Sequence, residues 1–445
     1  MVSMHTSPME APGAADAGGM NVVEWNEAIA LAEIGYEVDL MTRRSDPEHP
    51  DMVDIAPGVR LRYLDAGPAT VLPKSEIDQY IPQFGEALRG LPGYDVYHCQ
   101  HWMSGMAALD VAHEYGAPLV ISYHSVAAHP GRDLSEGEPP ESPRRVPGES
   151  RLAKESDHVI AISAAEARTV IFRCGAAPDK VSIIPPGVDL SLFHPIGPGG
   201  AQARFAERKT VAQEARSASV SELYGKKIGT IDKSMRKHSM HPNNSEFKNL
   251  ACAQAGPIDE EQRPYLAYAA RLQPLKGPDL AIRALASIDP SIRPRLVIAG
   301  AQSLDFADYA AELRNLVQDL GLNDDVSFIG PQSRTDLADL FAHANLVLVP
   351  SYSETFGLVA LEAAACGTPV IASAAGGLRE AVVHGESGQL MDSRDPEDWA
   401  RAITSLLVNQ EILDRMGVVA RVHARRFTWG SMARQVADVY ESLLS

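Results

Sequence analysis

The chain has 445 residues, enough for two or three domains, and 45% of them are hydrophobic, so it can bury substantial cores. Its 40 Lys and Arg stand against 58 Asp and Glu, and the formal charge of −18 argues against nucleic acid or an anionic membrane as a partner of the whole surface. Four scattered cysteines without Cys-x-x-Cys spacing are typical of free thiols. Because no signal peptide or membrane-length apolar run is found, we expect a soluble, cytoplasmic protein.

Strand and helix patterns alternate along the chain, which predicts α/β layers with largely parallel sheets. The first half has predicted strands at 2–4, 37–42, 96–98, 119–123, 158–163 and 181–184, with a helix at 20–34 between the first two. The second half has predicted strands at 265–270, 295–300, 326–329, 346–349, 370–373 and 389–391. Since the first strand begins almost at Met1, we expect that a few native residues precede it.

Pro185, Pro186 and Gly187 separate the two series of strands. We therefore predict a first domain at 1–186, completed by a C-terminal helix at 429–445, and a second domain at 187–428. Two doubly wound halves would face each other across a cleft, where open α/β sheets bind ligands beyond the carboxyl ends of their strands.

The segment 201–256 lacks this alternation. From 204 to 248 it carries 10 Lys and Arg against 5 Asp and Glu, a local charge of +5 in an acidic chain. We interpret it as a solvated insertion, with a regulatory or partner-binding loop as the alternative.

Two carboxylates flank the start of a helix predicted at 356–366. Glu354 lies in the loop and Glu362 on the helix, about 12 Å apart at a rise of about 1.5 Å per residue. Carboxylates that act together on one glycosidic bond stand roughly 5 to 9.5 Å apart, so this pair suits opposite ends of one long ligand. The backbone amides between them form a site for an anion such as a diphosphate. From spacing alone, two unrelated surface glutamates remain the alternative.

Two further motifs fall where a strand meets a helix. Gly18 and Gly19 allow close approach to the backbone at a helix start, and the lack of Gly-x-Gly-x-x-Gly argues against a dinucleotide dehydrogenase. Arg271 and Lys276 follow a strand and are placed to neutralise a departing diphosphate. Taken singly, each motif also fits an ordinary solvated turn.

Histidines end two strands of the first half. His98 and His101 lie at the end of one of these strands, and His124 lies at the end of another. A lone histidine in such a position is more often structural than catalytic, although several polar groups at neighbouring strand ends favour a shared site.

Together these motifs resemble those of the retaining glycosyltransferases of family 4, whose GT-B fold has two Rossmann-like domains. The resemblance rests on the Glu-x7-Glu pair, on Arg271 with Lys276, and on Gly-Gly-Leu-Arg-Glu at 376–380, and it covers nearly the whole chain except 201–256. The segments 5–8, 16–21, 331–337 and 350–354 are similar to members that transfer N-acetylglucosamine from UDP to 1D-myo-inositol 3-phosphate in mycothiol synthesis. The resemblance implies a UDP-sugar donor and no redox cofactor.

The resemblance also implies residue roles. Catalytic roles would fall to His124, Arg271, Lys276 and Glu354. The donor would contact Ala11, Pro12, Gly19, Arg271, Lys276, Gln332, Glu354 on the hexose and Glu362 on the ribose. The acceptor would contact His5, Asp16, Ala17, Gly18, Gly19, Met20, Asn21, Lys74, His101, Ser125 and Arg145. A structural magnesium ion would lie near Phe341, Ala342, Ala344 and Thr368.

Three positions depart from the family pattern. His101 replaces a usual Tyr and Ser125 a usual Thr in the phosphate pocket, and Ala11 replaces a usual Gln near the donor. A His and a Ser can still donate hydrogen bonds to a phosphate, so we expect the transferase function to be kept. The identity of the acceptor is not decided by these residues.

The sequence is also compatible with several other functions. They are another family 4 hexosyltransferase acting on a sugar phosphate or a lipid, a UDP-sugar epimerase of the same fold, and a non-catalytic sugar-nucleotide sensor. The chain lacks a basic amphipathic anchor, which disfavours a lipid acceptor and a stable membrane anchor. We expect small-molecule substrates and no nucleic-acid partner, and a homodimer is left open.

Overall fold

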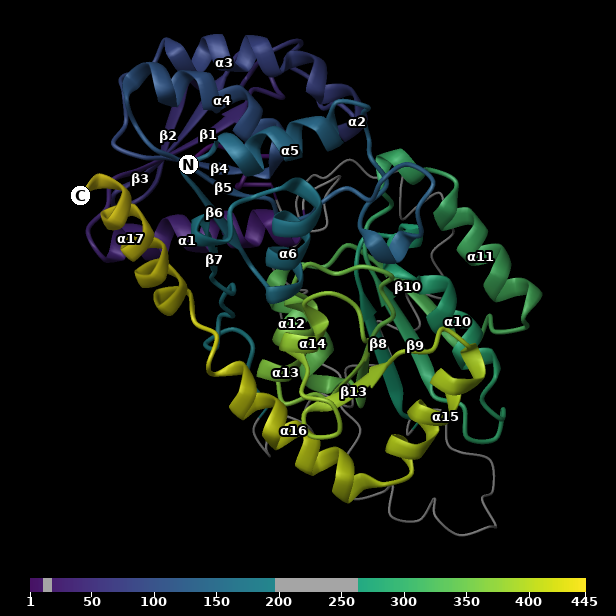
Figure 1. Ribbon diagram of the computed structural model, residues 1–445. Helices are drawn as coiled ribbons and strands as arrows, with labels where there is room; N and C mark the ends of the chain where they lie inside the picture. The colour runs from purple at the N-terminus through teal and green to yellow at the C-terminus, as the bar shows by residue number, and fades with distance from the viewer. Residues whose placement is uncertain (11–17, 197–262) are drawn as a thin grey trace.

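The computed structural model describes residues 1–10, 18–196 and 263–445, which form two α/β halves (Figure 1). Four residues of the predicted site, Ala11, Pro12, Asp16 and Ala17, lie outside the described residues. The predicted basic insertion at 201–256 lies outside them as well.

A largely parallel β-structure forms the centre of the N-terminal half. Its strands are β1 (Val38–Arg43), β2 (Met52–Ala56), β3 (Val59–Leu64), β4 (Tyr97–Gln100), β5 (Leu119–Ser122), β6 (His158–Ala161) and β7 (Val181–Ile183). They pair in two groups, β1-β3-β2 and β4-β5-β6-β7, and Val2 joins the groups by parallel bridges to Met41 and Cys99. The strand predicted at 2–4 is therefore a single bridging residue, hydrogen-bonded on both sides.

Helices cover both faces of this β-structure. They are α1 (Gly19–Glu33), α2 (Lys74–Ile77), α3 (Ile81–Arg89), α4 (His101–Tyr115), α5 (Arg145–Glu155), α6 (Ala164–Thr169) and α17 (Trp429–Leu444). The last of these, drawn in yellow, returns from the other half and packs against α1 (Figure 1). It buries Met432, Ala433, Val436 and Tyr440 in a core cluster with residues of α1, β1 and β3.

The C-terminal half contains one parallel sheet of six strands in the order β10-β9-β8-β11-β12-β13. The strands are β8 (Tyr265–Ala269), β9 (Arg295–Ala299), β10 (Val326–Gly330), β11 (Leu346–Val349), β12 (Val370–Ser373) and β13 (Gly388–Met391). The covering helices are α10 (Pro278–Ala286), α11 (Tyr309–Asp319), α12 (Arg334–His343), α13 (Leu358–Ala365), α14 (Leu378–Ala381), α15 (Pro396–Leu407) and α16 (Gln410–Ala424). Each strand predicted for this half is present within about one residue. The inner strands β8, β9, β11 and β12 are almost completely buried, and strands buried on both faces form continuous apolar runs in the sequence.

The hairpin of β2 and β3 is not predicted from the sequence. Gly58, with φ +75°, makes its turn, and the two strands pair antiparallel. One face of β3 is polar, because Arg60 and Arg62 each donate to the buried Asp39 carboxylate at 2.6 Å. This alternation removes the continuous hydrophobic run by which the other strands are predicted.

In the described residues, the chain passes between the halves near Gly187 and again near Thr428, and these two crossings lie side by side. Val188 N donates to Phe427 O at 3.2 Å. A Cβ on Gly187 would lie 2.3 Å from Trp429 N and 2.6 Å from Thr428 C, so the contact between the crossings requires glycine.

We expect Gly187→Ala to destabilise the protein by about 1 to 3 kcal/mol, because the added methyl overlaps backbone that cannot turn aside. The matched control is Gly430→Ala, whose new Cβ in α17 would have its nearest neighbour, Arg434 Nη1, at 3.9 Å. Alanine is a better helix former, so the control should unfold at or above the wild-type Tm. Equal Tm values for both variants would contradict this account of the crossing.

Candidate functional site

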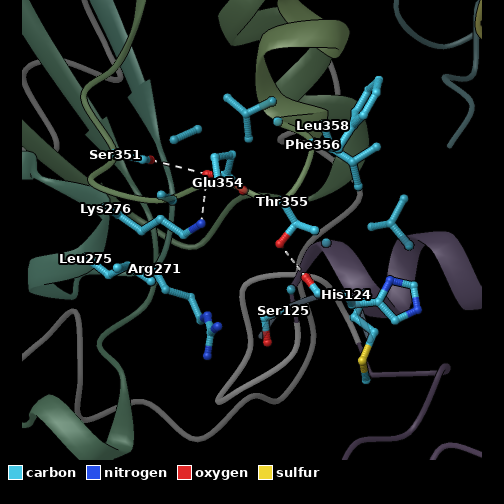
Figure 2. A pocket seen from close by; sticks show the side chains of 18 of the residues that line it. His124, Ser125, Arg271, Leu275, Lys276, Ser351, Glu354, Thr355, Phe356 and Leu358 are labelled. Carbon is cyan, nitrogen blue, oxygen red and sulfur yellow. Dashed lines mark hydrogen bonds and ion pairs between the residues drawn. The ribbon is translucent and has the colours of Figure 1, made fainter. Parts of the chain in front are cut away.

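A cavity of about 280 Å³ lies between the two halves and is lined by residues of both. The halves touch at its rim, where Thr355 Oγ1 donates to the His124 backbone carbonyl at 2.6 Å (Figure 2). Away from the rim, Ala164 N donates to Glu380 Oε1 at 2.7 Å. The cavity is the cleft that the two-domain prediction anticipates at the carboxyl ends of the strands.

Most of the predicted site residues within the described part of the chain line this cavity. They are His5, Gly18, Gly19, Met20, Asn21, Lys74, His101, His124, Ser125, Arg271, Lys276, Gln332, Glu354 and Glu362. Arg145 lies behind this wall, with its Nη2 3.0 Å from Ser125 Oγ.

Two helix N-termini meet across the cavity. A Cβ on Gly18 would lie 3.7 Å from Arg271 Nε, and one on Gly19 would lie 3.3 Å from Leu358 Cδ1, so α1 and the start of α13 are in close contact. The first turn of α13 closes with Leu361 N donating to Gly357 O, which leaves the preceding amides without a partner inside the helix. Both helix ends carry partial positive charge, which favours an anion between them.

Lys276 and Glu354 form an ion pair on the C-terminal wall. Lys276 Nζ lies 2.8 Å from Glu354 Oε2, and Ser351 Oγ donates to the same oxygen at 3.2 Å. Figure 2 shows Arg271 reaching from the same wall toward the space that faces His124 and Ser125. Because Glu354 Oε2 already accepts from two groups, the geometry suits a positioning role better than that of a free nucleophile.

The loop that carries Glu354 is seated on the glycines of the Gly-Gly-Leu-Arg-Glu segment. A Cβ on Gly376 would lie 2.0 Å from Glu354 O, and one on Gly377 would lie 2.2 Å from Thr355 O. Gly377 N also donates to Glu354 O at 2.9 Å. The two glycines therefore allow the backbone of Glu354 and Thr355 to pack directly against them, which determines the position of the Glu354 loop at the cavity.

Glu362 lies on α13 and is paired with a residue to which the sequence assigns no role. Arg334, at the start of α12, places Nη1 2.6 Å from Glu362 Oε1, and its guanidinium stacks over Phe193 at 4.8 Å. Burial raises the pKa of Glu362, and the Arg334 charge opposes that shift. The sequence signal for Arg334 is weak, since Ser333 before it indicates only a helix N-cap.

His124 is held by a buried chain of polar groups from β4 and α1. Gln100 Nε2 donates to Glu27 Oε2 at 3.5 Å, which orients Gln100 so that its Oε1 faces His124 Nε2 at 2.5 Å. His124 Nε2 therefore carries the proton, and Nδ1 is left as an acceptor. Burial, with a contribution from His98, lowers the pKa of His124 to about 3, so the ring is neutral at physiological pH. Neither Gln100 nor Glu27 is predicted from the sequence.

Two histidines predicted to contact the acceptor, His5 and His101, are neighbours in the cavity wall, with their ring centroids 4.3 Å apart and their planes tilted by 41°. Within the described residues, His5 Nδ1 and both nitrogens of His101 have no hydrogen-bond partner although they are buried. Burial lowers the pKa of both rings well below the usual value, and the cations Lys74 and Arg145 lower it further. Buried ring nitrogens without partners indicate a place where a polar ligand binds.

Asn21 lines the cavity, and its side-chain amide is bonded to neighbouring protein groups. Its Nδ2 donates to Thr6 Oγ1 and to Ser7 O, both at 2.7 Å, and its Oδ1 accepts from Gly18 N at 2.9 Å. These bonds tie the 6–7 loop to the start of α1, so the side chain supports the wall of the cavity.

The geometry does not support the predicted magnesium site. The Phe341 carbonyl already accepts from Thr368 Oγ1 at 2.6 Å and from Ala344 N at 3.1 Å. Ala342 and Ala344 contribute no acidic side chain, and the described residues contain no group of three or more His, Cys, Asp or Glu that could hold a metal ion. Magnesium favours octahedral oxygen ligands that include carboxylates, so these residues do not fit it.

Comparison with known proteins shows to which family the chain belongs. Residues 254–423 match a model described as glycosyl transferases group 1, and residues 18–187 match a glycosyl transferase 4-like domain. The D-inositol 3-phosphate glycosyltransferase of Stackebrandtia nassauensis is 36% identical over 99% of this chain and 90% of its own length. That of Streptomyces coelicolor is 35% identical over 100% of this chain and 91% of its own. The chain belongs to the group 1 glycosyltransferase family.

Solved structures confirm the GT-B fold of this glycosyltransferase. A sucrose-phosphate synthase from Thermosynechococcus elongatus has a TM-score of 0.78 at 28% identity, covering 99% of this chain and 98% of that one. Anabaena Alr3699/HepE, in complex with UDP and glucose, has a TM-score of 0.68 at 18% identity, covering 99% of each chain. In the part of the glycosyltransferase that the structure describes, no helix is both long and apolar enough to span a membrane.

Acid should destabilise this glycosyltransferase through its buried neutral histidines. The unfolded chain protonates His101 near its usual pKa of 6.5, whereas the folded state keeps the ring neutral, so stability is lost as the pH falls below about 6.5. We expect His101→Gln to flatten the fall in unfolding free energy between pH 6.5 and 4.5 by about 1 kcal/mol per pH unit. Denaturant unfolding at three pH values measures this.

The control is the same substitution at His113, an exposed position near the other end of α4. His113→Gln should leave the pH dependence unchanged. A His101→Gln protein as acid-sensitive as the wild type would show that His101 is not neutral when folded.

Proposed function

We propose that this glycosyltransferase transfers N-acetylglucosamine from UDP-N-acetylglucosamine to 1D-myo-inositol 3-phosphate, with retention at the anomeric carbon. The observation that carries the proposal is one cavity with cations at two ends, Arg271 and Lys276 on one wall and Lys74, backed by Arg145, on the other. These ends suit a donor diphosphate and an acceptor phosphate. The names of the relatives from Stackebrandtia and Streptomyces support the acceptor, and HepE has been solved with UDP and with UDP-glucose.

In this proposal the donor lies along the C-terminal wall. Glu362, held by Arg334, accepts hydrogen bonds from the ribose hydroxyls, and Glu354, held by Lys276, contacts the hexose. The diphosphate lies between them, against the amides that precede Leu361 and beside the Gly18–Gly19 turn. Gln332 lines the nucleotide end of the same wall.

The reaction exchanges one glycosidic bond for another on the same face of the sugar. The bond between the anomeric carbon and the diphosphate oxygen breaks, and the acceptor hydroxyl forms the new bond from that face. The hydroxyl proton passes to the departing diphosphate, so no protein carboxylate is consumed. Arg271 and Lys276 stabilise the charge that develops on the leaving group.

His124 contributes as a neutral acceptor in this mechanism. Its Nε2 proton is committed to Gln100, so Nδ1 is available to accept a hydrogen bond from a hydroxyl of the transferred sugar. The bond from Thr355 to the His124 carbonyl holds the backbone of His124 beside the donor loop. The contact between the two halves thereby helps to position the ring that orients the sugar.

We expect Lys276→Met to lower kcat about 100- to 1,000-fold, the scale on which removal of one charge-stabilising group acts. Tm should change little, because Lys276 is a partly exposed side chain at the cleft. Lys154→Met on the outside of α5 is the control and should retain full activity. UDP release measures the rate, and a near-normal rate for Lys276→Met would remove this lysine from the mechanism.

A substrate panel tests the function itself. UDP-glucose and UDP-N-acetylglucosamine are each combined with inositol 3-phosphate, with hexose phosphates and with no acceptor, and UDP release is followed. We expect release only with UDP-N-acetylglucosamine and inositol 3-phosphate together. Conversion of the UDP-sugar without acceptor would indicate an epimerase, and binding without turnover a sensor.

Lys74→Met separates acceptor from donor recognition. Because Lys74 faces the acceptor end, the acceptor KM should rise roughly tenfold or more while the donor KM is unchanged. An unchanged acceptor KM would point to a neutral acceptor.

A different sugar phosphate as acceptor is the second candidate. The observation that favours it is the sucrose-phosphate synthase, which is similar over nearly the whole chain. The two departures at the acceptor end, His101 and Ser125, also fall where an acceptor ring and its phosphate are expected. The hexose phosphates of the panel decide between the two acceptors.

A further inference from the structure

One carboxylate occupies the position that the proposed function gives to the acceptor phosphate. Ser125 Oγ donates to Glu138 Oε2 at 3.1 Å, and Arg145 Nη1 lies 3.2 Å from the same oxygen. Lys74 Nζ lies 3.5 Å from it. A single oxygen of Glu138 thus lies close to three of the four side chains predicted for the phosphate pocket, the fourth being His101.

Glu138 is charged in this position. Burial alone favours the protonated acid, but Lys74 and Arg145, with smaller contributions from Arg271 and Lys276, hold the pKa of Glu138 well below its usual range. The carboxylate is therefore an anion bound by the cations of the acceptor end, in the same way as a phosphate oxygen would be bound.

A second carboxylate nearby has a different position. Glu141 Oε1 lies 2.8 Å from Lys74 Nζ and 2.6 Å from Arg145 Nη1, closer than Glu138 is to either cation. Glu138 lines the cavity whereas Glu141 does not. Glu141 therefore holds the two cations from behind, and Glu138 covers them from the side on which a ligand arrives.

The backbone around Glu138 is fixed, so the side chain is the part that can move. Ala128 N donates to Glu138 O at 2.8 Å, and Arg173 Nη1 donates to Glu136 O at 2.7 Å. Gly137 has φ +146°, and a Cβ there would lie 2.3 Å from Val126 O. Uncovering the cations therefore requires a change of the Glu138 rotamer and no opening of the loop.

We propose that Glu138 is a specificity-determining residue, whose carboxylate occupies the acceptor's phosphate site in the free enzyme and is displaced only by a phosphorylated acceptor. The inference rests on the proposed function for the identity of that acceptor. A phosphate dianion replaces the carboxylate because it brings more charge and three acceptor oxygens to the same donors. A neutral polyol brings neither, so it leaves the cations covered and is rejected.

Glu138→Gln tests the proposal because it removes the competing charge and keeps the size. We expect the KM for inositol 3-phosphate to fall roughly tenfold, and inorganic phosphate, measured by calorimetric titration, to bind more tightly by a similar factor. The control is Glu136→Gln, an exposed carboxylate two residues away that pairs with Arg132 and should change neither value. Glu138→Asp, which withdraws the carboxylate by one methylene, should give an intermediate gain and serves if the Gln variant folds poorly.

A double variant tests whether the gain in phosphate binding arises at the site that contains Lys74. The gain in phosphate binding should disappear in Glu138→Gln/Lys74→Met, because that protein lacks a cation of the site. Tighter phosphate binding without transfer to inositol phosphate would uphold the role of Glu138 and reject the proposed acceptor. An unchanged or raised KM in an active Glu138→Gln enzyme, or phosphate binding no tighter than in the wild type, would overturn the inference.

Discussion

Opposite charges held together in a poorly solvated cleft are the constraint on which the rest of this glycosyltransferase depends. Lys276 with Glu354 and Arg334 with Glu362 bring together segments that are 78 and 28 residues apart in the chain. Glu362 is the more deeply buried of the two carboxylates, so removal of Arg334 would leave an uncompensated charge in a low dielectric, whereas the Lys276–Glu354 pair is partly exposed. The pairs therefore fix the cleft before any substrate arrives, and each pair offers a substrate one group that is already oriented.

The same constraint explains why the backbone around the cleft is rich in close contacts. The loop bearing Glu354 can reach Lys276 only because Gly376 and Gly377 let its backbone descend onto α14. On the opposite wall the fit is looser, since a Cβ on Gly18 would lie at an ordinary contact distance of 3.7 Å from Arg271 Nε. Glycine thus sets the position of the Glu354 loop, and charge pairing sets the directions of the side chains inside the cleft.

The sequence predicts the fold well where burial dominates. Strands such as Leu346–Val349 and Val370–Ser373 have both faces covered, so they form apolar runs whose bounds agree with the structure. The hairpin of β2 and β3 is missed because its polar face is satisfied by Asp39, a partner that local patterns cannot identify. The position of Glu362 on its helix and of Glu354 before it was predicted, because both follow from one helix and its flanking turn.

Several site residues are not predicted from the sequence for the same reason, because their partners cannot be identified from local patterns. Arg334, Gln100 and Glu138 act through partners that are remote or that lie in a loop without regular periodicity, so neither spacing nor composition distinguishes them. Asn21 shows the converse, since a residue in a recognised motif has its amide committed to the loop at Thr6 and Ser7. A motif identifies the region of the chain that forms a site, whereas the role of each residue in that site depends on contacts that only the folded chain makes.

The return of α17 to the N-terminal half has a consequence for how the protein is made. Tyr440 completes a buried cluster by bonding to His98 across 342 residues of sequence, and Met432, Ala433 and Val436 cover an apolar face of the same half. While the chain emerges from the ribosome, that face stays open until the entire second half has been synthesised. Contacts between residues so far apart in the sequence slow folding, and the intermediates expose hydrophobic surface that is prone to aggregate. Efficient production of this enzyme should therefore depend on chaperones that shield the first half until its last helix arrives.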